Sequence, residues 1–266
     1  MGTRTPPPRR QLPAQTPTPA VTFSRGIRRS SWKVGIYGPE GVGKSSLASL
    51  CPGIKFIDAE YSTDDLDVER VDGIACEDFA ESWTRLRSFI QSLSSGIWAL
   101  DTMSRIEDWC ATFVIKSKPS NEGAKAKDSL EDYKYKAGLT FVCDEFRRLL
   151  GDIDNAYRRG ASFVLIAHNR ISRVKNPDGS DFIRQEPRLL DDPKGSNMLQ
   201  FVSFVDNLLF VDLDKSADKG KVVGSGSRTI YLDSSPSRLS KTRTLPRDPM
   251  DFQEGSTELW TMLGVK

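Results

Sequence analysis

The 266-residue chain is predicted to fold as an α/β protein in which helices flank a mostly parallel sheet and an antiparallel hairpin follows near the C-terminus. Strand-like and helix-like segments alternate from Trp32 onward, which is the order that builds parallel sheets. Several of the strands are apolar throughout, as expected where both faces of a sheet are covered. A glycine-rich turn, residues 38–45, joins the first strand to the first helix.

The first half of the chain alternates short apolar runs with helical repeats. Apolar residues at steps of three and four after Asp78 lie on one face of a helix. The expected elements are, in order, a strand at WKVGIYG (32–38), a helix starting at GKSSLASL (43–50), a strand at IKFID (54–58), a helix from Asp78 through Phe79, Trp83, Leu86, Ile90 and Leu93, a strand at GIWALD (96–101), and a helix through Ile106, Cys110 and Phe113.

The second half continues the alternation and ends in antiparallel elements. A polar loop with several lysines (116–127) separates the two halves. The expected elements are a long helix over 129–157, a strand at SFVLIAH (162–168), a long loop to about Asn197, a helix at MLQFVSFV (198–205), a strand at NLLFVDL (207–213), a hairpin over KVVGSGSRTIYLD (221–233), and a last helix in TELWTML that packs Leu259, Trp260 and Leu263.

Three regions are expected along the chain: an arm (residues 1–31), a core (32–245) and a tail with a short helix (246–266). The first 33 residues hold six of the fifteen prolines and seven basic residues but no acid, so the rest of the chain is mildly acidic. Such a stretch buries too little apolar surface to order itself, and we expect it to be disordered. It is either a tail of no special role or an arm that touches nucleic acid or a neighbouring subunit.

Cysteine use and hydropathy exclude several classes of protein. Cys51, Cys76, Cys110 and Cys143 are far apart and form no CxxC pair, and the chain has one histidine. This argues against a zinc site and a disulfide framework, and favours a reducing compartment. No run approaches the ~18 apolar residues of a membrane span. We expect a soluble cytoplasmic protein without a membrane partner.

The turn GPEGVGKS (38–45) fits the phosphate-binding pattern G-x-x-x-x-G-K-[ST], with a strand before it and a helix after it. Glycines let the backbone N–H groups of such a loop face a β-phosphate. Lys44 is expected to reach the β- and γ-phosphates of ATP, and the Ser45 hydroxyl to coordinate Mg²⁺. The expected nucleotide-binding residues are Gly38, Pro39, Glu40, Gly41, Val42, Gly43, Lys44, Ser45 and Ser46.

A second magnesium ligand is expected at Asp101, where the apolar strand GIWALD ends. The alternative is an aspartate that caps a turn. Many AAA+ motors place the catalytic glutamate directly after this aspartate, but here Thr102 follows it. The catalytic acid must therefore come from elsewhere, and the stretch KFIDAEYSTDD (55–65) offers acids at the end of another strand.

The segments IYGPEGVGKSSL and FIDAEYSTDDLD resemble the nucleotide site of the RecA-type recombinases, and this resemblance implies a RecA-like P-loop NTPase core. The resemblance implies that Glu60 activates the attacking water, a role that suits a carboxylate at the tip of a strand next to the phosphate loop. Asp58 is then structural or a secondary magnesium contact. His168 occupies the place of a glutamine that senses the γ-phosphate, although a core histidine is the alternative.

Residues 32–245 resemble more closely the phage-encoded RecA-like ATPases of the Sak single-strand-annealing group. That resemblance implies a phage-encoded protein in the host cytoplasm, acting as a ring or filament of identical subunits. Lys241 and Arg243 follow the last hairpin, where basic residues of RecA-type filaments reach the neighbouring subunit's ATP. A solvated basic turn is the alternative.

Two basic segments are candidates for single-stranded DNA binding. One is the expected loop 169–188, because basic groups with an aromatic residue hold single strands without sequence preference. The other is the loop 116–127, and the alternative for both is a solvated surface. The candidate residues are Arg170, Arg173, Lys175, Phe182, Arg184, Lys125 and Lys127.

We therefore expect an ATPase that binds single-stranded DNA and promotes annealing or recombination, working beside a single-strand binding protein. An alternative is an ATP-switched regulatory or assembly protein that engages a protein partner without stimulation by DNA. A motor ATPase is disfavoured because the aspartate–glutamate pair is missing. The residues leave open strand exchange or annealing, ring or filament, and whether hydrolysis or only ATP binding is required.

Overall fold

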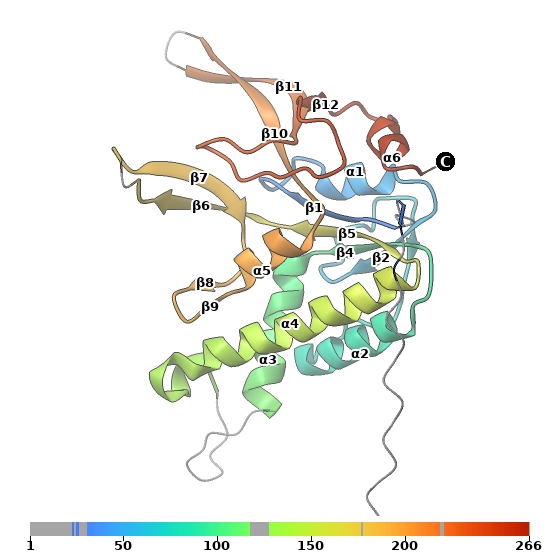
Figure 1. Cartoon of the computed structure of the whole chain (residues 1–266), viewed down its shortest axis with the longest axis vertical. Coiled ribbons are helices and arrows are strands. Elements are labelled where there is room, and N and C mark those ends of the chain that lie inside the picture. The colour runs from blue at the N-terminus through green and yellow to red at the C-terminus, as the bar shows by residue number, and fades with distance from the viewer. Residues whose placement is uncertain are drawn as a thin grey trace, which may run out of the picture.

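The central element is a sheet whose strands follow the order β12-β11-β10-β1-β5-β4-β2-β3 (Figure 1). The computed structural model describes residues 23, 25–26, 31–117, 128–176, 178–218 and 221–265, without the side chains of 215–218 and 221–226. The strands of this sheet are β1 (Lys33–Tyr37), β2 (Ile54–Asp58), β3 (Glu69–Arg70), β4 (Ile97–Asp101), β5 (Ser162–Ala167), β10 (Asn207–Asp218), β11 (Lys221–Tyr231) and β12 (Met250–Asp251).

The α/β prediction is confirmed, including the parallel core and an antiparallel C-terminal hairpin, but this hairpin is formed by β10 and β11 and does not lie within residues 221–233 as expected. Strand β1 lies between β5 and β10 and is parallel to both, and β4 is parallel to β5 and β2. Strands β10, β11 and β12 are antiparallel. The register pairs Asp58 with Asp101 and Tyr37 with Ala167. The carboxyl ends of these parallel strands therefore meet at one edge, where ligands bind in such sheets.

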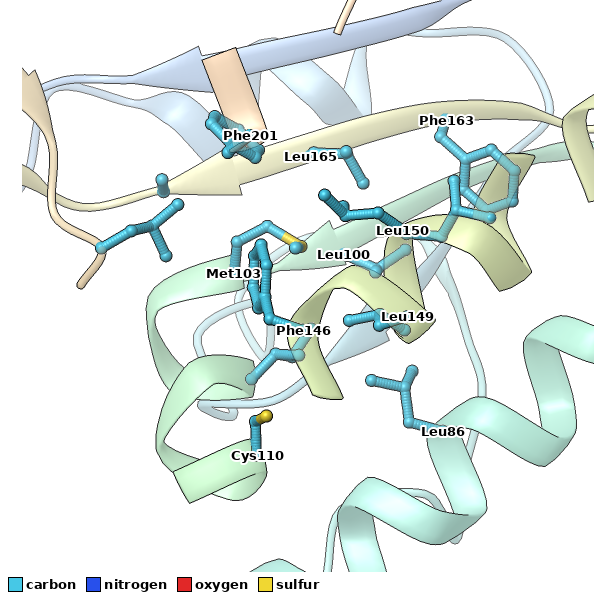
Figure 2. Close-up of a cluster of buried hydrophobic side chains, with 14 of the residues drawn as sticks. Leu86, Leu100, Met103, Cys110, Phe146, Leu149, Leu150, Phe163, Leu165 and Phe201 are labelled. Atoms are coloured by element: carbon cyan, nitrogen blue, oxygen red, sulfur yellow. The ribbon is translucent and has the colours of Figure 1, made fainter. Parts of the chain in front are cut away.

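Helices cover both faces of the sheet (Figure 1). The larger cluster of buried apolar residues joins α2 (Phe79–Ser92), α3 (Met103–Ser117), α4 (Ala137–Arg158) and α5 (Asn197–Phe204) to one face. Figure 2 shows part of this cluster, to which three helices contribute Leu86, Met103 and Phe146 and the sheet contributes Leu100 and Leu165. In the described part of the chain, no helix is long and apolar enough to cross a membrane.

The opposite face is covered by α1 (Lys44–Ser49) and α6 (Glu258–Met262). Trp260 is fully buried, its Nε1 donates a hydrogen bond to the carbonyl of Leu47 at 3.1 Å, and its ring lies 5.8 Å from that of Trp32. Leu259 is buried as well, while Leu263 is partly buried against this core. The expected packing of a last helix is confirmed.

The predicted start of the long helix was wrong. Helix α4 begins at Ala137 rather than near residue 129, because Tyr135 and Lys136 adopt left-handed φ values of 56° and 59° that stop the helix. The residues before it form 3₁₀ turns, Leu130–Asp132 and Lys134–Lys136.

The expected long loop after β5 is instead an antiparallel hairpin, β6 (Asn169–Val174) with β7 (Phe182–Pro187), followed by β8 (Asp191–Asp192) and β9 (Gly195–Ser196). Polar Ser172 and Glu186 face inward, whereas Ile171 and Ile183 are each 66% exposed. This is the reverse of the usual pattern of a half-buried strand. The usual sign of a half-buried strand, a row of apolar side chains on its inner face, is therefore missing from the sequence of this hairpin.

Candidate active site

A cleft of about 380 Å³ lies at the carboxyl ends of the parallel strands. Its lining brings together residues from the turn after β1, the end of β2, the end of β4 and the residue after β5. The candidate residues that line it are Glu40, Gly41, Gly43, Lys44, Ser45, Ser46, Glu60, Asp101 and His168. The structure thus gathers in one place residues that are more than 120 positions apart in the sequence.

The turn between β1 and α1 needs glycine for two reasons. A Cβ at Gly38 would clash with the carbonyl oxygen of Val211 on β10, so the chain approaches that strand too closely for a side chain. Gly41 and Gly43 have φ values of 70° and 88°, which are strained for other residues. Lys44 is buried, its Nζ donates to the carbonyls of Gly38 (3.0 Å) and Pro39 (2.8 Å), and burial lowers its pKa.

Ser45 and Asp101 form a pair that fits a magnesium ion. The Ser45 hydroxyl donates to Asp101 Oδ2 at 2.5 Å, and Asp101 is 1% exposed. Its Oδ1 is buried and has no hydrogen-bond partner among the described residues. Burial raises the pKa of Asp101 to about 6, because the surrounding groups do not fully offset the cost of removing its ionised form from water. Mg²⁺ takes one or two protein oxygens and keeps phosphate or water oxygens as its other ligands. Ser45 and Asp101 are the residues that would hold it.

Glu60 lies two residues after the end of β2, and its side chain is 18% exposed. Its Oε1 accepts hydrogen bonds from Thr102 Oγ1 (2.8 Å) and His168 Nε2 (2.9 Å), and His168 lies 3.1 Å from Oε2. Arg105 Nε lies 4.0 Å from Oε1. Burial acts to raise the pKa of Glu60, but the hydrogen bonds from His168 and Thr102 outweigh it and hold the pKa below its usual value. Glu60 is therefore ionised at neutral pH.

Asp58 anchors the loop that carries Glu60. Its Oδ1 accepts the backbone N–H of Glu60 at 3.0 Å, and its Oδ2 accepts the N–H (2.8 Å) and hydroxyl (2.6 Å) of Thr63. Arg70 on β3 donates to Thr63 Oγ1 at 2.8 Å and to the carbonyl of Leu66 at 2.6 Å. This network supports the structural reading of Asp58.

Among the described residues that the sequence did not single out, four lie beside Glu60 or the phosphate loop: Thr102, Arg105, Arg228 and Phe252. Thr102 and Arg105 contact Glu60, as described above. A Cβ built on Gly43 would lie 3.1 Å from Arg228 Nη1 and 3.1 Å from Phe252 Cε1. Arg228 and Phe252 thus flank the phosphate loop from β11 and the segment after β12. Thr102 carried a signal, since it directly follows Asp101, but the other three depend on contacts between distant segments.

Lys241 and Arg243 do not lie in the cleft of their own chain. Lys241 pairs with Leu208 near the beginning of β10, and β10 starts at the opposite edge of the sheet from the cleft. Its Nζ donates to the carbonyls of Val202 and Ser203 at the end of α5, and burial lowers its pKa to about 8. Arg243 Nη1 lies 3.5 Å from Asp206 Oδ1. Their role as fingers toward a neighbouring subunit stays a prediction.

The candidate DNA residues divide into paired and exposed groups. Arg170 bonds to Glu186 (3.1 Å) and Asp191 (2.7 Å), and Arg184 bonds to Glu186 at 2.5 Å. Phe182 is partly buried, and Lys175 is exposed. The Arg173 side chain is 80% exposed, with Asp181 3.7 Å away. Lys125 and Lys127 lie outside the described residues.

Comparison with known proteins agrees with this geometry. A protein-family model described as an AAA domain matches residues 30–244. No curated protein matches the chain significantly. The matched span includes the cleft and both hairpins, β6–β7 and β10–β11.

Proposed function

The chain belongs to the AAA-domain family of P-loop ATPases, and from this premise we propose that it is a Mg²⁺-dependent ATPase that binds single-stranded DNA and promotes its annealing or recombination. The observation that carries the ATPase part is the convergence of Lys44, Ser45, Asp101 and Glu60 on one cleft. Phosphoryl transfer needs a positioned cation, a metal site and a residue that orients the attacking water. These four side chains supply all three.

The chemistry follows from what each side chain can do. Lys44 exchanges its carbonyl partners for the β- and γ-phosphate oxygens, where its charge offsets negative charge. Bound Mg²⁺ would neutralise charge on the phosphate oxygens. Glu60, held ionised, accepts a hydrogen bond from the attacking water and takes its proton as the water oxygen bonds to the γ-phosphorus. The bond between that phosphorus and the β–γ bridging oxygen breaks in the same step, so that ADP leaves with the bridging oxygen and inorganic phosphate is formed.

The DNA part of the proposal rests on the β6–β7 hairpin. Arg173 and Lys175 are exposed there, and Ile171 and Ile183 offer apolar contact beside them. The hairpin begins at the residue after His168, which contacts Glu60. Single-stranded DNA bound to this hairpin could therefore alter the position of Glu60 through His168. We expect DNA to stimulate hydrolysis for this reason.

One observation favours the alternative, an ATP-switched assembly protein. Glu186 and Asp191 neutralise Arg170 and Arg184, so only part of the basic character of residues 169–188 is free to meet phosphates. The exposed isoleucines of the hairpin would equally suit a protein partner. In that case hydrolysis would not respond to DNA.

Assembly into a ring or filament of identical subunits, beside a single-strand binding protein, completes the proposal. Lys241 or Arg243 would have to leave its internal partners to act on a neighbouring ATP. A Lys241→Ala variant that hydrolyses ATP at the normal rate would remove Lys241 from this role.

Steady-state ATP hydrolysis, measured with and without single-stranded DNA, tests the proposal. We expect DNA to stimulate ATP hydrolysis. The variants Lys44→Ala and Glu60→Gln should lose hydrolysis both with and without DNA. Charge reversal at Arg173 and Lys175 should weaken DNA binding and flatten its salt dependence. Arg147→Glu is the matched control, since Arg147 is exposed on α4 and pairs with Asp144. A rate of ATP hydrolysis that is the same with and without DNA would favour the alternative, an ATP-switched assembly protein.

A further inference from the structure

Thr102 occupies the position directly after the buried Asp101 and reaches across to Glu60 on the neighbouring strand. We infer that Thr102 is a positioning residue, whose hydroxyl fixes the carboxylate of Glu60 so that one of its oxygens is presented to the attacking water. The inference rests on the proposed role of Glu60 and assigns a second residue to the same reaction.

The direction of the Thr102 hydroxyl is determined by its surroundings. Oγ1 accepts a hydrogen bond from the backbone N–H of Arg105 at 3.2 Å, in the first turn of α3. A hydroxyl has a single proton to donate, and the acceptor at 2.8 Å is Glu60 Oε1. Thr102 is 3% exposed, so solvent has little access to take over either bond. The hydroxyl is therefore a fixed donor to Glu60.

The two oxygens of Glu60 are consequently unequal. Oε1 accepts from Thr102 and from His168, and Arg105 lies 4.0 Å away on the same side. For Oε2, the hydrogen bond found among the described residues is the longer one, 3.1 Å to His168. A carboxylate oxygen can accept about two hydrogen bonds. Oε2 thus keeps capacity for the water, whereas Oε1 is occupied.

His168 does not provide this orientation by itself. Its Nε2 lies within hydrogen-bond distance of both oxygens, so it does not select between them. It also directly precedes the β6–β7 hairpin, whose proposed ligand would move it. Thr102 is instead set between β4 and α3 in the buried part of the molecule. Thr102 therefore holds Glu60 Oε1 in a fixed position.

The test compares Thr102→Val, which removes the hydroxyl at nearly constant volume, with Thr102→Ser, which keeps it. We expect Thr102→Val to lower kcat by about 10- to 100-fold, the range expected for one hydrogen bond to a charged group. KM, and the Kd of a fluorescent ATP analogue measured by titration, should change by less than about 3-fold, because Thr102 orients Glu60 rather than binding ATP. Thr102→Ser should restore kcat.

Glu60→Gln separates failure of the inference from failure of the proposed function. If Glu60→Gln hydrolyses ATP normally, the role of Glu60 is wrong and the inference falls with it. If Glu60→Gln is inactive but Thr102→Val is not, only the inference is overturned. Thr102→Val should add no further loss to Glu60→Gln, and an undiminished additional loss would show that Thr102 acts by another route.

A purely structural role gives a different result. It would weaken binding of the fluorescent analogue and lower the unfolding midpoint together with kcat, and that outcome overturns the inference. If Thr102→Val does not fold, Thr102→Ala provides the same comparison without an apolar branch next to Glu60. Hydrolysis by Thr102→Ala at the wild-type rate would likewise overturn it.

Discussion

Replacement of Asp101 by asparagine is expected to stabilise the free protein while removing a ligand of the proposed magnesium site. The Asp101 carboxylate is 1% exposed, and its Oδ1 has no hydrogen-bond partner among the described residues. Ser45 supplies one hydrogen bond to Oδ2. An ionised group in this position costs free energy unless a cation is present. The asparagine side chain would remove that charge and keep an oxygen to accept from Ser45.

The size of the effect follows from the pKa of Asp101, which burial raises from 3.8 to about 6. The folded protein binds the proton of the Asp101 carboxyl more tightly than the unfolded chain does. Protonation of Asp101 therefore stabilises the folded state below pH 3.8, and this stabilisation is lost as the pH rises to about 6. The difference between these two pKa values corresponds to a loss of about 3 kcal/mol in the free energy of unfolding at pH 8, and about half of that at pH 5. The buried NH₂ group of asparagine costs about 1 kcal/mol. The expected net gain at pH 8 is about 2 kcal/mol.

Urea denaturation in EDTA, at pH 8 and pH 5, measures this gain. The advantage of Asp101→Asn should be larger at pH 8, and Mg²⁺–ATP should stabilise the wild type but not the variant. Asp152→Asn is the matched control, because Asp152 is buried but paired with Arg87 at 2.6 Å and Gln91 at 3.0 Å, and its loss should destabilise. An Asp101→Asn variant that is less stable than the wild type at pH 8 would refute the reasoning.

Three further outcomes are expected. Trp260→Ala should lower the free energy of unfolding by about 3–5 kcal/mol, because the ring is fully buried and bonds to Leu47; a loss below about 1 kcal/mol in urea would contradict this. Tyr37→Phe should raise amide exchange in β7, since its hydroxyl lies 2.6 Å from the carbonyl of Leu239 and 3.0 Å from that of Gln185; unchanged exchange would contradict that role. Burial raises the pKa of Glu107 from 4.5 to about 7, so this group's contribution to stability falls as the pH rises between those values; Glu107→Gln should gain stability relative to the wild type at pH 8 but not at pH 4.

The sequence by itself determined the sheet core and the phosphate-binding part of the site. Apolar strands alternating with helical repeats allow few arrangements other than a parallel sheet covered on both faces. The glycine, lysine and serine positions of residues 38–45 are local, and so is the placement of Asp101 at the end of a strand. Such features depend on residues close together in the chain, which is why they can be predicted from the sequence.

The tertiary structure alone decided what surrounds Glu60 and what the basic residues contact. Thr102, Arg105 and His168 meet Glu60 because β4 and β5 lie beside β2 in the sheet and end at the same edge. The β6–β7 hairpin escaped prediction because ion pairs, not apolar side chains, fill its inner face. Side-chain pairing across strands depends on register and direction, and a hydrogen bond or ion pair requires both partners within about 3–4 Å. Those distances are set only when segments remote in the sequence have packed together.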